Sequence, residues 1–264
     1  MTWEKKRVLV TAKAAPEKST KYGECVCTAG ITDEGEFIRL YPIPLTLFRR
    51  GQGFKKFDWI ECEVEKADEM LRRKESYKVK DGSIRVVDQS MHKKVKGRVD
   101  WASRNKVVLP LKSKSIEDLE QAFKEDRTSL GLIKVKELIE FFKTGELEEE
   151  DKIIHKVMQT VLDQSFGTEK LRGFEPLQQI PHIYKYRFTC EGDACHKHRM
   201  TCEDWELFQA HRIWPRTYGD RTWEMLQDKF YQKMKNSDLH FFMGTESRYG
   251  RWLIIGIYYP PQLD

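Results

Sequence analysis

A dense group of cysteine and histidine residues between positions 184 and 214 constrains the fold of this chain more than any other feature. Three of the six cysteines and three of the seven histidines lie in this stretch. Thiolate and imidazole groups suit zinc, and a structural zinc ion needs four ligands in a tetrahedral arrangement. The pattern therefore predicts a small metal-binding turn built into a larger fold, between a strand and the start of a helix.

The ligand spacing is C-x4-C-x2-H, which is short for a two-knuckle zinc finger, because the second ligand pair of such a finger usually lies a dozen or more residues away. Free cysteines also act simply as small buried hydrophobes, which is the alternative explanation. Charged residues surround this cluster, so we favour a metal, and zinc over an iron–sulfur cluster. The predicted ligands are Cys190, Cys195, His198 and Cys202, with His196, Cys25 or Cys27 as alternatives for the fourth position.

The helix after this cluster has acids in its first turn. Thr201 followed three residues later by Asp204 resembles a capping box, and the helix dipole favours acids such as Glu206 at this end. A catalytic role is the alternative, since bond cleavage needs a carboxylate that activates water. Asp58, which we expect near an arginine and a tyrosine, is a third candidate. The catalytic candidates are Asp204, Glu206 and Asp58.

Positive charge is concentrated in one part of the sequence. The whole chain carries 47 Lys and Arg against 42 Asp and Glu, a net charge of +5. Residues 70–106 hold twelve of the cations and only four acids, interleaved with aromatic side chains. Cations neutralise phosphates and aromatic rings stack on bases, although a charge run is often only a solvated face. The predicted nucleic-acid-binding residues are Arg39, Tyr41, Tyr77, Lys93, Lys94, Lys96, Arg98, Trp101 and Arg104.

Strand patterns occupy both ends of the chain. Residues 57–65 alternate strictly, with Ile60, Cys62 and Val64 on the buried face. Helical spacing in the middle predicts helices from Ser115, over 135–142 and over 149–164. These patterns predict an α+β class with a β-rich barrel or curled sheet, completed by a C-terminal hairpin of residues 239–244 and 251–259. The predicted parts are 1–110, β-rich and nucleic-acid-binding; 111–167, helical; and 168–264, which holds the metal knuckle.

Several functional classes lack their signatures. The sequence contains no G-x-x-x-x-G-K-[ST], G-x-G-x-x-G, H-E-x-x-H or G-x-S-x-G motif. The longest apolar run, residues 252–259, is shorter than the roughly 20 residues that span a bilayer. The charged start carries no secretory signal pattern. We therefore expect a cytoplasmic protein with reduced thiols and no membrane partner.

Four segments resemble an uncharacterised family of bacterial and archaeal proteins. They are residues 24–31 (ECVCTAGI), 38–44 (IRLYPIP), the C-x4-C-x2-H cluster with Asp204-Trp-Glu206, and the terminal FMGT and IIGI motifs. The resemblance covers nearly the whole chain and implies nucleic-acid work in a DNA-handling or defence setting. The β-rich first half is also similar to PUA- or ASCH-like modules.

The combined prediction is a zinc-stabilised protein that binds nucleic acid, DNA in preference to RNA, and recognises a modified or unpaired base. The first alternative is an enzyme acting on nucleic acid, either a metal-dependent nuclease or a base-excising hydrolase such as a DNA glycosylase. The second is a structural subunit of a larger protein complex.

Overall fold

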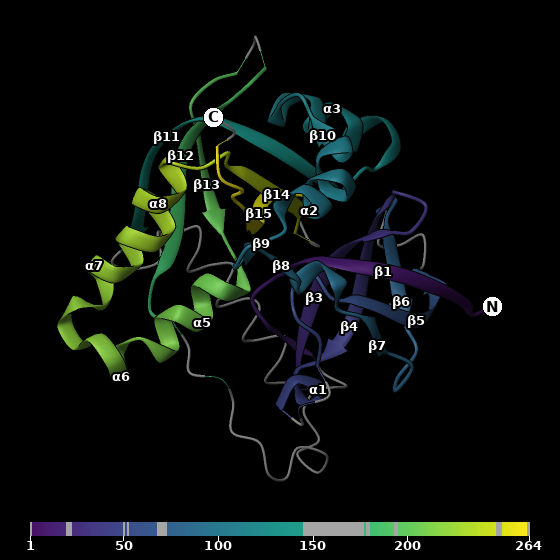
Figure 1. Cartoon of the computed structure of the whole chain (residues 1–264). Helices are drawn as coiled ribbons and strands as arrows, with labels where there is room; N and C mark the ends of the chain where they lie inside the picture. Colours follow the sequence, from purple (N-terminus) through teal and green to yellow (C-terminus); the bar gives the residue numbers. More distant parts are fainter. Residues whose placement is uncertain are drawn as a thin grey trace.

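The chain forms two β-barrels that lie side by side and are joined by a short helical connection (Figure 1). The computed structural model describes residues 2–19, 23–49, 51, 53–67, 73–144, 177, 180–192, 195–246 and 250–262. Strands dominate, with helices between and beside the barrels, which confirms the predicted α+β class and the predicted barrel. No helix within these ranges is long and apolar enough to cross a membrane.

The first barrel follows from alternating apolar side chains. In β5, Ile60, Cys62 and Val64 are buried, as the alternation predicted. Five strands close in the order β1-β3-β4-β6-β5, with β5 returning to β1 and with β4 and β6 parallel. The elements are β1 (Glu4–Lys13), β2 (Glu17–Ser19), β3 (Gly23–Thr32), β4 (Phe37–Pro44), α1 (Leu45–Arg49), β5 (Trp59–Lys66), β6 (Ser76–Val79) and β7 (Arg85–Asp88).

The connection between the barrels contains two capped helices. Asp100 accepts a hydrogen bond from the Ser103 amide at the start of α2, at 3.1 Å. Ser115 accepts one from the Asp118 amide at the start of α3, at 3.0 Å, where the sequence predicted a helix. The elements are η2 (Ser90–His92), β8 (Lys94–Val95), β9 (Arg98–Val99), α2 (Trp101–Val108), η3 (Leu109–Leu111), β10 (Lys112–Ser113) and α3 (Ile116–Asp126).

The second barrel repeats the connectivity of the first. Its strands close in the order β11-β12-β13-β15-β14, with β14 returning to β11 and with β13 and β15 parallel. A helical segment connects the third strand of this barrel, β13, to the fourth, β14. The elements are β11 (Leu130–Thr144), β12 (Ile183–Cys190), β13 (His198–Cys202), α5 (Trp205–Ile213), α6 (Pro215–Tyr218), η4 (Gly219–Arg221), α7 (Thr222–Gln227), the π-helix η5 (Asp228–Gln232), α8 (Lys233–Lys235), β14 (His240–Thr245) and β15 (Trp252–Tyr258).

Both barrels share the topology of an OB fold. When the five barrel strands are counted along the chain, each barrel has the order 1-2-3-5-4 with strands 3 and 5 parallel. The OB fold is a five-stranded Greek-key barrel that presents ligands with the outer face of strands 2 and 3. In this chain those strands are β3 and β4 in the first barrel, and β12 and β13 in the second.

The helix predicted over 135–142 is wrong, because these residues form the second half of strand β11. Two register shifts interrupt its pairing with β12, one between Val135 and Glu137 and one between Leu138 and Glu140. Each bulge adds a residue, so the buried positions Val135, Leu138 and Phe141 fall three apart and imitate helical spacing. The helix predicted over 149–164 lies outside the described residues.

The sequence predicted that the C-terminal hairpin completes the N-terminal sheet, and this prediction is wrong. The hairpin strands β14 and β15 pair with β11 and β13 and so close the second barrel. The hairpin is apolar on both faces because its outer face meets the first barrel. There Phe242, Ile255 and Tyr258 share one buried cluster with Leu9 and Ile31 of β1 and β3.

Close packing fixes the two barrels against each other. A Cβ atom on Gly256 of β15 would lie 2.6 Å from the Cβ of Ala12 in β1, so only glycine allows this approach. Ala15 also donates a backbone hydrogen bond to the carbonyl of Glu203, which lies between β13 and α5. The barrels therefore share an apolar interface as well as a covalent connection.

Candidate functional site

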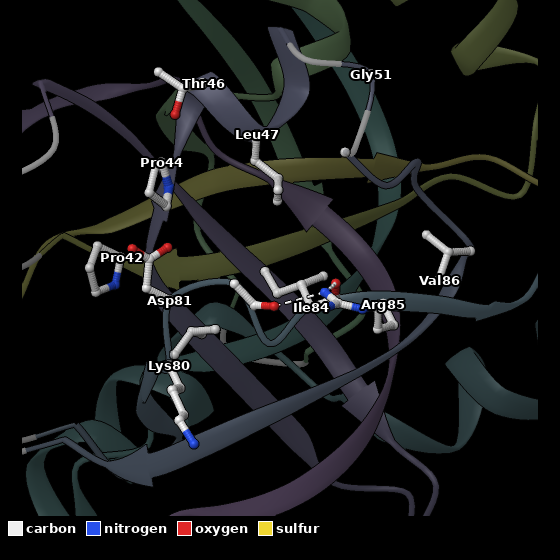
Figure 2. Close-up of a pocket in the computed structure, with 13 residues that line it drawn as sticks. Pro42, Pro44, Thr46, Leu47, Gly51, Lys80, Asp81, Ile84, Arg85 and Val86 are labelled. Carbon is white, nitrogen blue, oxygen red and sulfur yellow. Dashed lines mark hydrogen bonds between the residues drawn. The ribbon is translucent and has the colours of Figure 1, made fainter. Parts of the chain in front are cut away.

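A cavity of ≈ 620 Å³ opens at one end of the first barrel, between β4, α1 and the β6–β7 connection (Figure 2). Pro42, Pro44 and Leu47 form part of its wall. The Arg85 guanidinium donates hydrogen bonds to two backbone carbonyls of this connection, each at 2.7 Å. Lys80 pairs with a Glu63 carboxylate oxygen at 2.7 Å. The cations of the cavity thus have local partners, and it brings together no group of metal ligands among the described residues.

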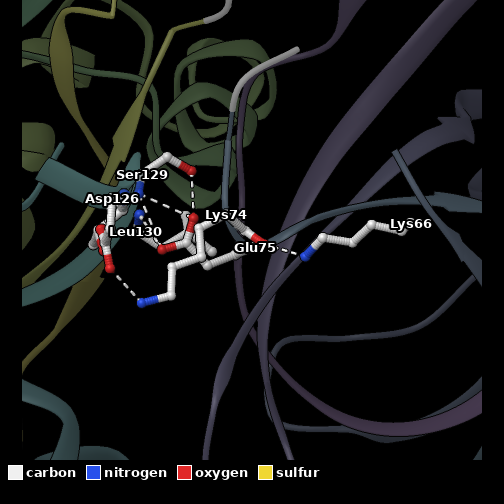
Figure 3. A network of polar contacts seen from close by, with 7 residues as sticks. Lys66, Lys74, Glu75, Asp126, Ser129 and Leu130 are labelled. Carbon is white, nitrogen blue, oxygen red and sulfur yellow. Dashed lines mark hydrogen bonds and ion pairs between the residues drawn. The ribbon is translucent and has the colours of Figure 1, made fainter. Parts of the chain in front are cut away.

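The outer face of β3 and β4 in the first barrel is covered by the second barrel. Arg39 of β4 is 4% exposed and donates a hydrogen bond to the Ser129 carbonyl at 2.7 Å, next to β11. The Glu75 carboxylate accepts hydrogen bonds from the Ser129 amide and hydroxyl (Figure 3). Arg39, a predicted nucleic-acid contact, therefore joins the two barrels, and Tyr41 lies half-buried on the same strand.

An exposed ion pair borders this interface. Lys74 Nζ lies 2.5 Å from a carboxylate oxygen of Asp126, at the end of α3. The Lys74 ammonium and the Thr128 side chain donate to this carboxylate and lower the pKa of Asp126 to about 2. Lys66 donates to the Lys74 carbonyl, as Figure 3 shows. The usual ligand face of the first barrel is thus an interface with the second.

The outer face of the second barrel carries an aromatic ring with two arginines near it. Arg187 of β12 and Arg199 of β13 are register partners, and both are exposed. Their guanidinium carbons lie 6.0 Å and 5.1 Å from the ring centre of the half-buried Phe142. Arg187 also pairs with Glu140 at 3.2 Å. We call Phe142, Arg187 and Arg199 the arginine face. Lys185 alternates onto the same side but is buried.

Aromatic residues on the inner side hold these strands in place. Tyr184, Tyr186 and Phe188 alternate with the outward cations and are completely buried. The Tyr186 hydroxyl donates to the Phe230 carbonyl at 2.8 Å, which ties β12 to the helical segment. Phe141 stacks on Tyr186 with ring centres 4.7 Å apart. This packing is extensive, so the orientation of the arginine face is determined by the core of the barrel.

Four metal-ligating side chains converge at the connection between β12 and β13. One ligand atom each from Glu117, Cys190, Cys195 and His198 lies within 4.8 Å of the others. The two sulfur atoms are 3.0 Å apart, and His198 Nε2 lies 3.6 Å from Cys190 Sγ and 3.3 Å from Cys195 Sγ. Glu117 Oε1 lies 3.5 Å from His198 Nε2. Zinc bond lengths place tetrahedral ligand atoms roughly 3.3–3.8 Å apart, so this group can hold a metal ion.

Burial shapes the protonation of this group. It raises the pKa of the Cys195 thiol to about 11, with a further contribution from the neighbouring Cys190, and it lowers the pKa of His198. A neutral imidazole is the form that binds a metal. The Glu117 Oε2 atom is buried and has no hydrogen-bond partner among the described residues. An unsatisfied carboxylate oxygen beside two thiols and an imidazole fits a cation bound between them.

Three of the four predicted ligands thus lie together, and the fourth does not. Cys202 is completely buried at the far end of β13, in the core of the second barrel, and is not part of the group. Glu117 takes the fourth place. The sequence predicted only a helix start at Ser115 and gave no signal that Glu117 is a ligand. The alternative ligands Cys25 and Cys27 lie in β3 of the first barrel, and His196 is exposed.

The catalytic candidates Asp204 and Asp58 are buried and support local structure. Asp204 caps α5 and accepts hydrogen bonds from the Leu207 and Ile257 amides, at 3.0 and 3.2 Å. Burial raises its pKa to about 6. The Asp58 carboxylate accepts from the Lys55 amide at 2.7 Å and contacts His92 Nε2 at 2.8 Å. Glu206, the remaining candidate, is exposed on α5.

The predicted basic residues fall into two groups. Lys93, Lys94, Lys96 and Arg98 are exposed on and beside the β8–β9 hairpin, which Figure 1 places at the junction of the barrels. Arg104 instead is buried and donates twice to the Met91 carbonyl, at 3.0 and 2.8 Å.

The two predicted stacking residues contact neighbouring side chains. Trp101 packs on Tyr258 with ring centres 5.5 Å apart. Tyr77 is half-buried and lies under the Lys66 ammonium, 4.4 Å from its ring centre.

Comparison with known sequences and structures gives family matches without a described activity. Residues 4–110 match a domain of unknown function (DUF8758) and residues 112–264 match another (DUF8757). Comparison with curated proteins finds no match. Among solved structures, the chain is similar to one described as "Structure and Conformational Change of a Replication Protein A Heterotrimer Bound to ssDNA", with 10% identity and a TM-score of 0.39.

That structural match covers 100% of this chain but only 50% of the other. These comparisons give no support for the predicted similarity to PUA or ASCH modules. They confirm the resemblance to an uncharacterised family, and the second family model spans more than half of the sequence. The chain therefore belongs to the family defined by the domain of unknown function DUF8757.

Proposed function

We propose that this protein binds single-stranded nucleic acid through the arginine face of its second barrel. One observation carries the proposal: β12 and β13, the strands with which an OB fold presents its ligand, carry two exposed arginines whose guanidinium groups lie near the Phe142 ring of the neighbouring strand β11. The corresponding face of the first barrel is closed by the second, so the second barrel is the binding unit.

The chemistry of the face suits unpaired bases. A base can stack on the Phe142 ring, an interaction that accepts any base because each has a π-face. The guanidinium groups of Arg187 and Arg199 can stack on bases or donate to phosphate oxygens. A duplex hides its base faces, and we therefore propose unpaired strands, DNA before RNA, as the ligand.

The β8–β9 hairpin is the second element of this proposal. Its cations Lys93, Lys94, Lys96 and Arg98 are exposed, and none forms an ion pair with another described residue. Free ammonium and guanidinium groups of this kind attract phosphates without reading sequence. We assign the hairpin to phosphate contacts that extend the binding region.

The third element is a structural zinc ion held by Glu117, Cys190, Cys195 and His198. Two thiolates and an imidazole favour zinc over magnesium or calcium, which prefer oxygen ligands. The catalytic alternative gains no support from the placement of Asp58 and Asp204, since their carboxylates accept hydrogen bonds from backbone amides. The proposal is therefore a binding protein rather than a hydrolase.

Fluorescence anisotropy with labelled oligonucleotides tests the proposal. We expect submillimolar affinity for single-stranded DNA at low ionic strength, weaker binding of duplex DNA, and a steep loss of affinity with salt. The double variant Arg187→Ala/Arg199→Ala should lose most of the affinity. Arg221→Ala removes an exposed arginine from η4 and serves as the matched control. Equal binding by both variants, or no binding by the wild type at low salt, would overturn the proposal.

A further inference from the structure

We infer that a metal ion bound by Glu117, Cys190, Cys195 and His198 holds the β12–β13 connection in the conformation that positions the arginine face. The metal would thus control nucleic-acid affinity from outside the binding surface. This inference rests on the proposed function and adds a regulator to it. Glu117 and the three other ligands act as positioning residues, because none belongs to the arginine face itself.

Two of the ligands lie at the ends of the strands that form the hairpin. Cys190 is the last residue of β12 and His198 is the first residue of β13. His198 pairs with Phe188, and the adjacent register pair is Arg187 with Arg199. The metal ligands therefore hold the loop end of the hairpin, directly beside the two arginines. Separation of the strands at this end would change the distance between Arg187 and its register partner Arg199.

Among the described residues, few contacts outside the ligand group hold the β12–β13 connection. The Cys195 amide donates to the Gly192 carbonyl at 3.1 Å. Glu191 pairs with Lys112 at 2.8 Å and with Lys134 at 3.4 Å, but all three side chains are between 37% and 40% exposed. Exposed ion pairs of this kind contribute little stability. The ligand group and the packing of Gly192 on Ser115 are thus the described contacts that can fix this turn.

The start of α3 lies against the turn between β12 and β13. Glu117 lies in the first turn of α3, whose N-cap is Ser115. A Cβ atom on Gly192 would lie only 2.5 Å from the Ser115 Cβ, so the turn is pressed against the helix start. A metal bridging Glu117 and the three ligands of the turn would lock this arrangement. Without a cation, only weak sulfur hydrogen bonds connect Cys190, Cys195 and His198, with atom separations of 3.0–3.6 Å.

The structural effect of metal loss should remain local to the β12–β13 connection. The ligand Cys190 lies at the edge of the barrel core under the arginine face, but the rings of Tyr186 and Phe188 in that core also pack on Phe241, which is not a metal ligand. Loss of the metal should therefore leave the barrel folded and lower the fraction of molecules with a correctly placed hairpin. Apparent affinity scales with that fraction, so a fall to about one tenth weakens binding about tenfold.

The test compares zinc-loaded and metal-free protein under reducing conditions. Elemental analysis should give one zinc per chain. Removal of zinc with a chelator should weaken binding of a single-stranded oligonucleotide about tenfold, and added zinc should restore it. Circular dichroism should change little, while hydrogen exchange should rise in residues 187–201. Unchanged affinity and exchange after removal of the zinc, or an absence of bound zinc, would overturn the inference.

Paired variants separate the metal from other effects. Glu117→Gln removes one ligand, while Asp118→Asn removes the neighbouring exposed acid. Cys195→Ser is matched by Cys27→Ser, a cysteine outside the group. Only Glu117→Gln and Cys195→Ser should lose zinc and bind the oligonucleotide more weakly. If the protein unfolds globally without zinc, the metal is required for the whole fold. That result would contradict an effect confined to the β12–β13 connection.

A zinc-loaded wild type that binds no oligonucleotide would refute the proposed function. Hydrogen exchange would still report whether the metal orders the turn, so the two failures are distinguishable.

Discussion

Glu75 accepts two hydrogen bonds from Ser129 across the boundary between the barrels, one from the amide at 3.0 Å and one from the hydroxyl at 2.7 Å. Both residues are buried. Arg39 donates to the carbonyl of the same serine at 2.7 Å, so one residue at the start of the second barrel is held from two sides. The relative orientation of the barrels therefore depends on a polar contact as well as on apolar packing.

Glu75→Gln should destabilise the protein by about 2 kcal/mol, because the buried amide and hydroxyl of Ser129 would meet a weaker acceptor. Urea unfolding of the variant measures this loss. Glu63→Gln removes an exposed carboxylate that pairs with Lys80 and should cost under about 1 kcal/mol. Similar losses in both variants would contradict the importance of the buried contact.

Gly256→Ala should destabilise the barrel interface, since the new Cβ would lie 2.6 Å from the Ala12 Cβ. Overpacking of this kind costs about 1–3 kcal/mol. The double variant Ala12→Gly/Gly256→Ala restores space and should recover part of the stability. Thermal unfolding of the two single variants and the double variant measures the coupling. Additive losses would show that the two positions do not press on each other.

The sequence predicted the barrel strands where apolar residues alternate, as in β5, but it failed where bulges disturbed the alternation. Val135, Leu138 and Phe141 are spaced like a helix only because β11 contains two register shifts. That error also concealed the arginine face, because it assigned Phe142 to a helix. A short-range pattern cannot distinguish a bulged strand from a helical turn.

The candidate metal group shows the same division between local and long-range information. Cys190, Cys195 and His198 lie within nine residues, and their spacing alone brings them together. Glu117 reaches them only through tertiary packing of α3 against the turn. Cys202, the predicted fourth ligand, is much nearer to the other three in sequence than Glu117 is. In an extended strand, however, four residues separate it from His198 by roughly 13 Å.

Asp204 should make stability fall as pH rises from about 4 to about 6. Burial raises its pKa in the folded state to about 6, above the ordinary value of 3.8, so the folded protein holds the proton more tightly. Its contribution is fully present below the unfolded pKa and is lost as pH rises through the folded pKa. The shift corresponds to a loss on the order of 3 kcal/mol. Urea unfolding at several pH values measures it, and Asp204→Asn should flatten this part of the curve.

The β8–β9 hairpin should affect the salt dependence of nucleic-acid binding more than the sequence specificity of that binding. Replacement of Lys93, Lys94, Lys96 and Arg98 by Gln should reduce the slope of log affinity against log salt by up to about 0.7 for each lost phosphate contact. The change should be the same for different base sequences. Lys5→Gln and Lys229→Gln remove cations from other parts of the surface and serve as controls. A slope equal to that of the wild type would exclude the hairpin from the binding region.

Phe142→Ala should weaken binding of single strands without changing its salt dependence, because the ring contributes stacking and no charge. Stacking of one base on an aromatic side chain is worth about 1–3 kcal/mol, so affinity should fall by roughly 5- to 150-fold. Tyr218→Ala removes an exposed aromatic ring from α6 and is the matched control. Since Phe142 is half-buried, thermal unfolding must show that the variant is folded at the assay temperature. Phe142→Trp keeps a stacking surface and should retain affinity, so equal losses in the Ala and Trp variants would mean that the ring supports the strand rather than a base.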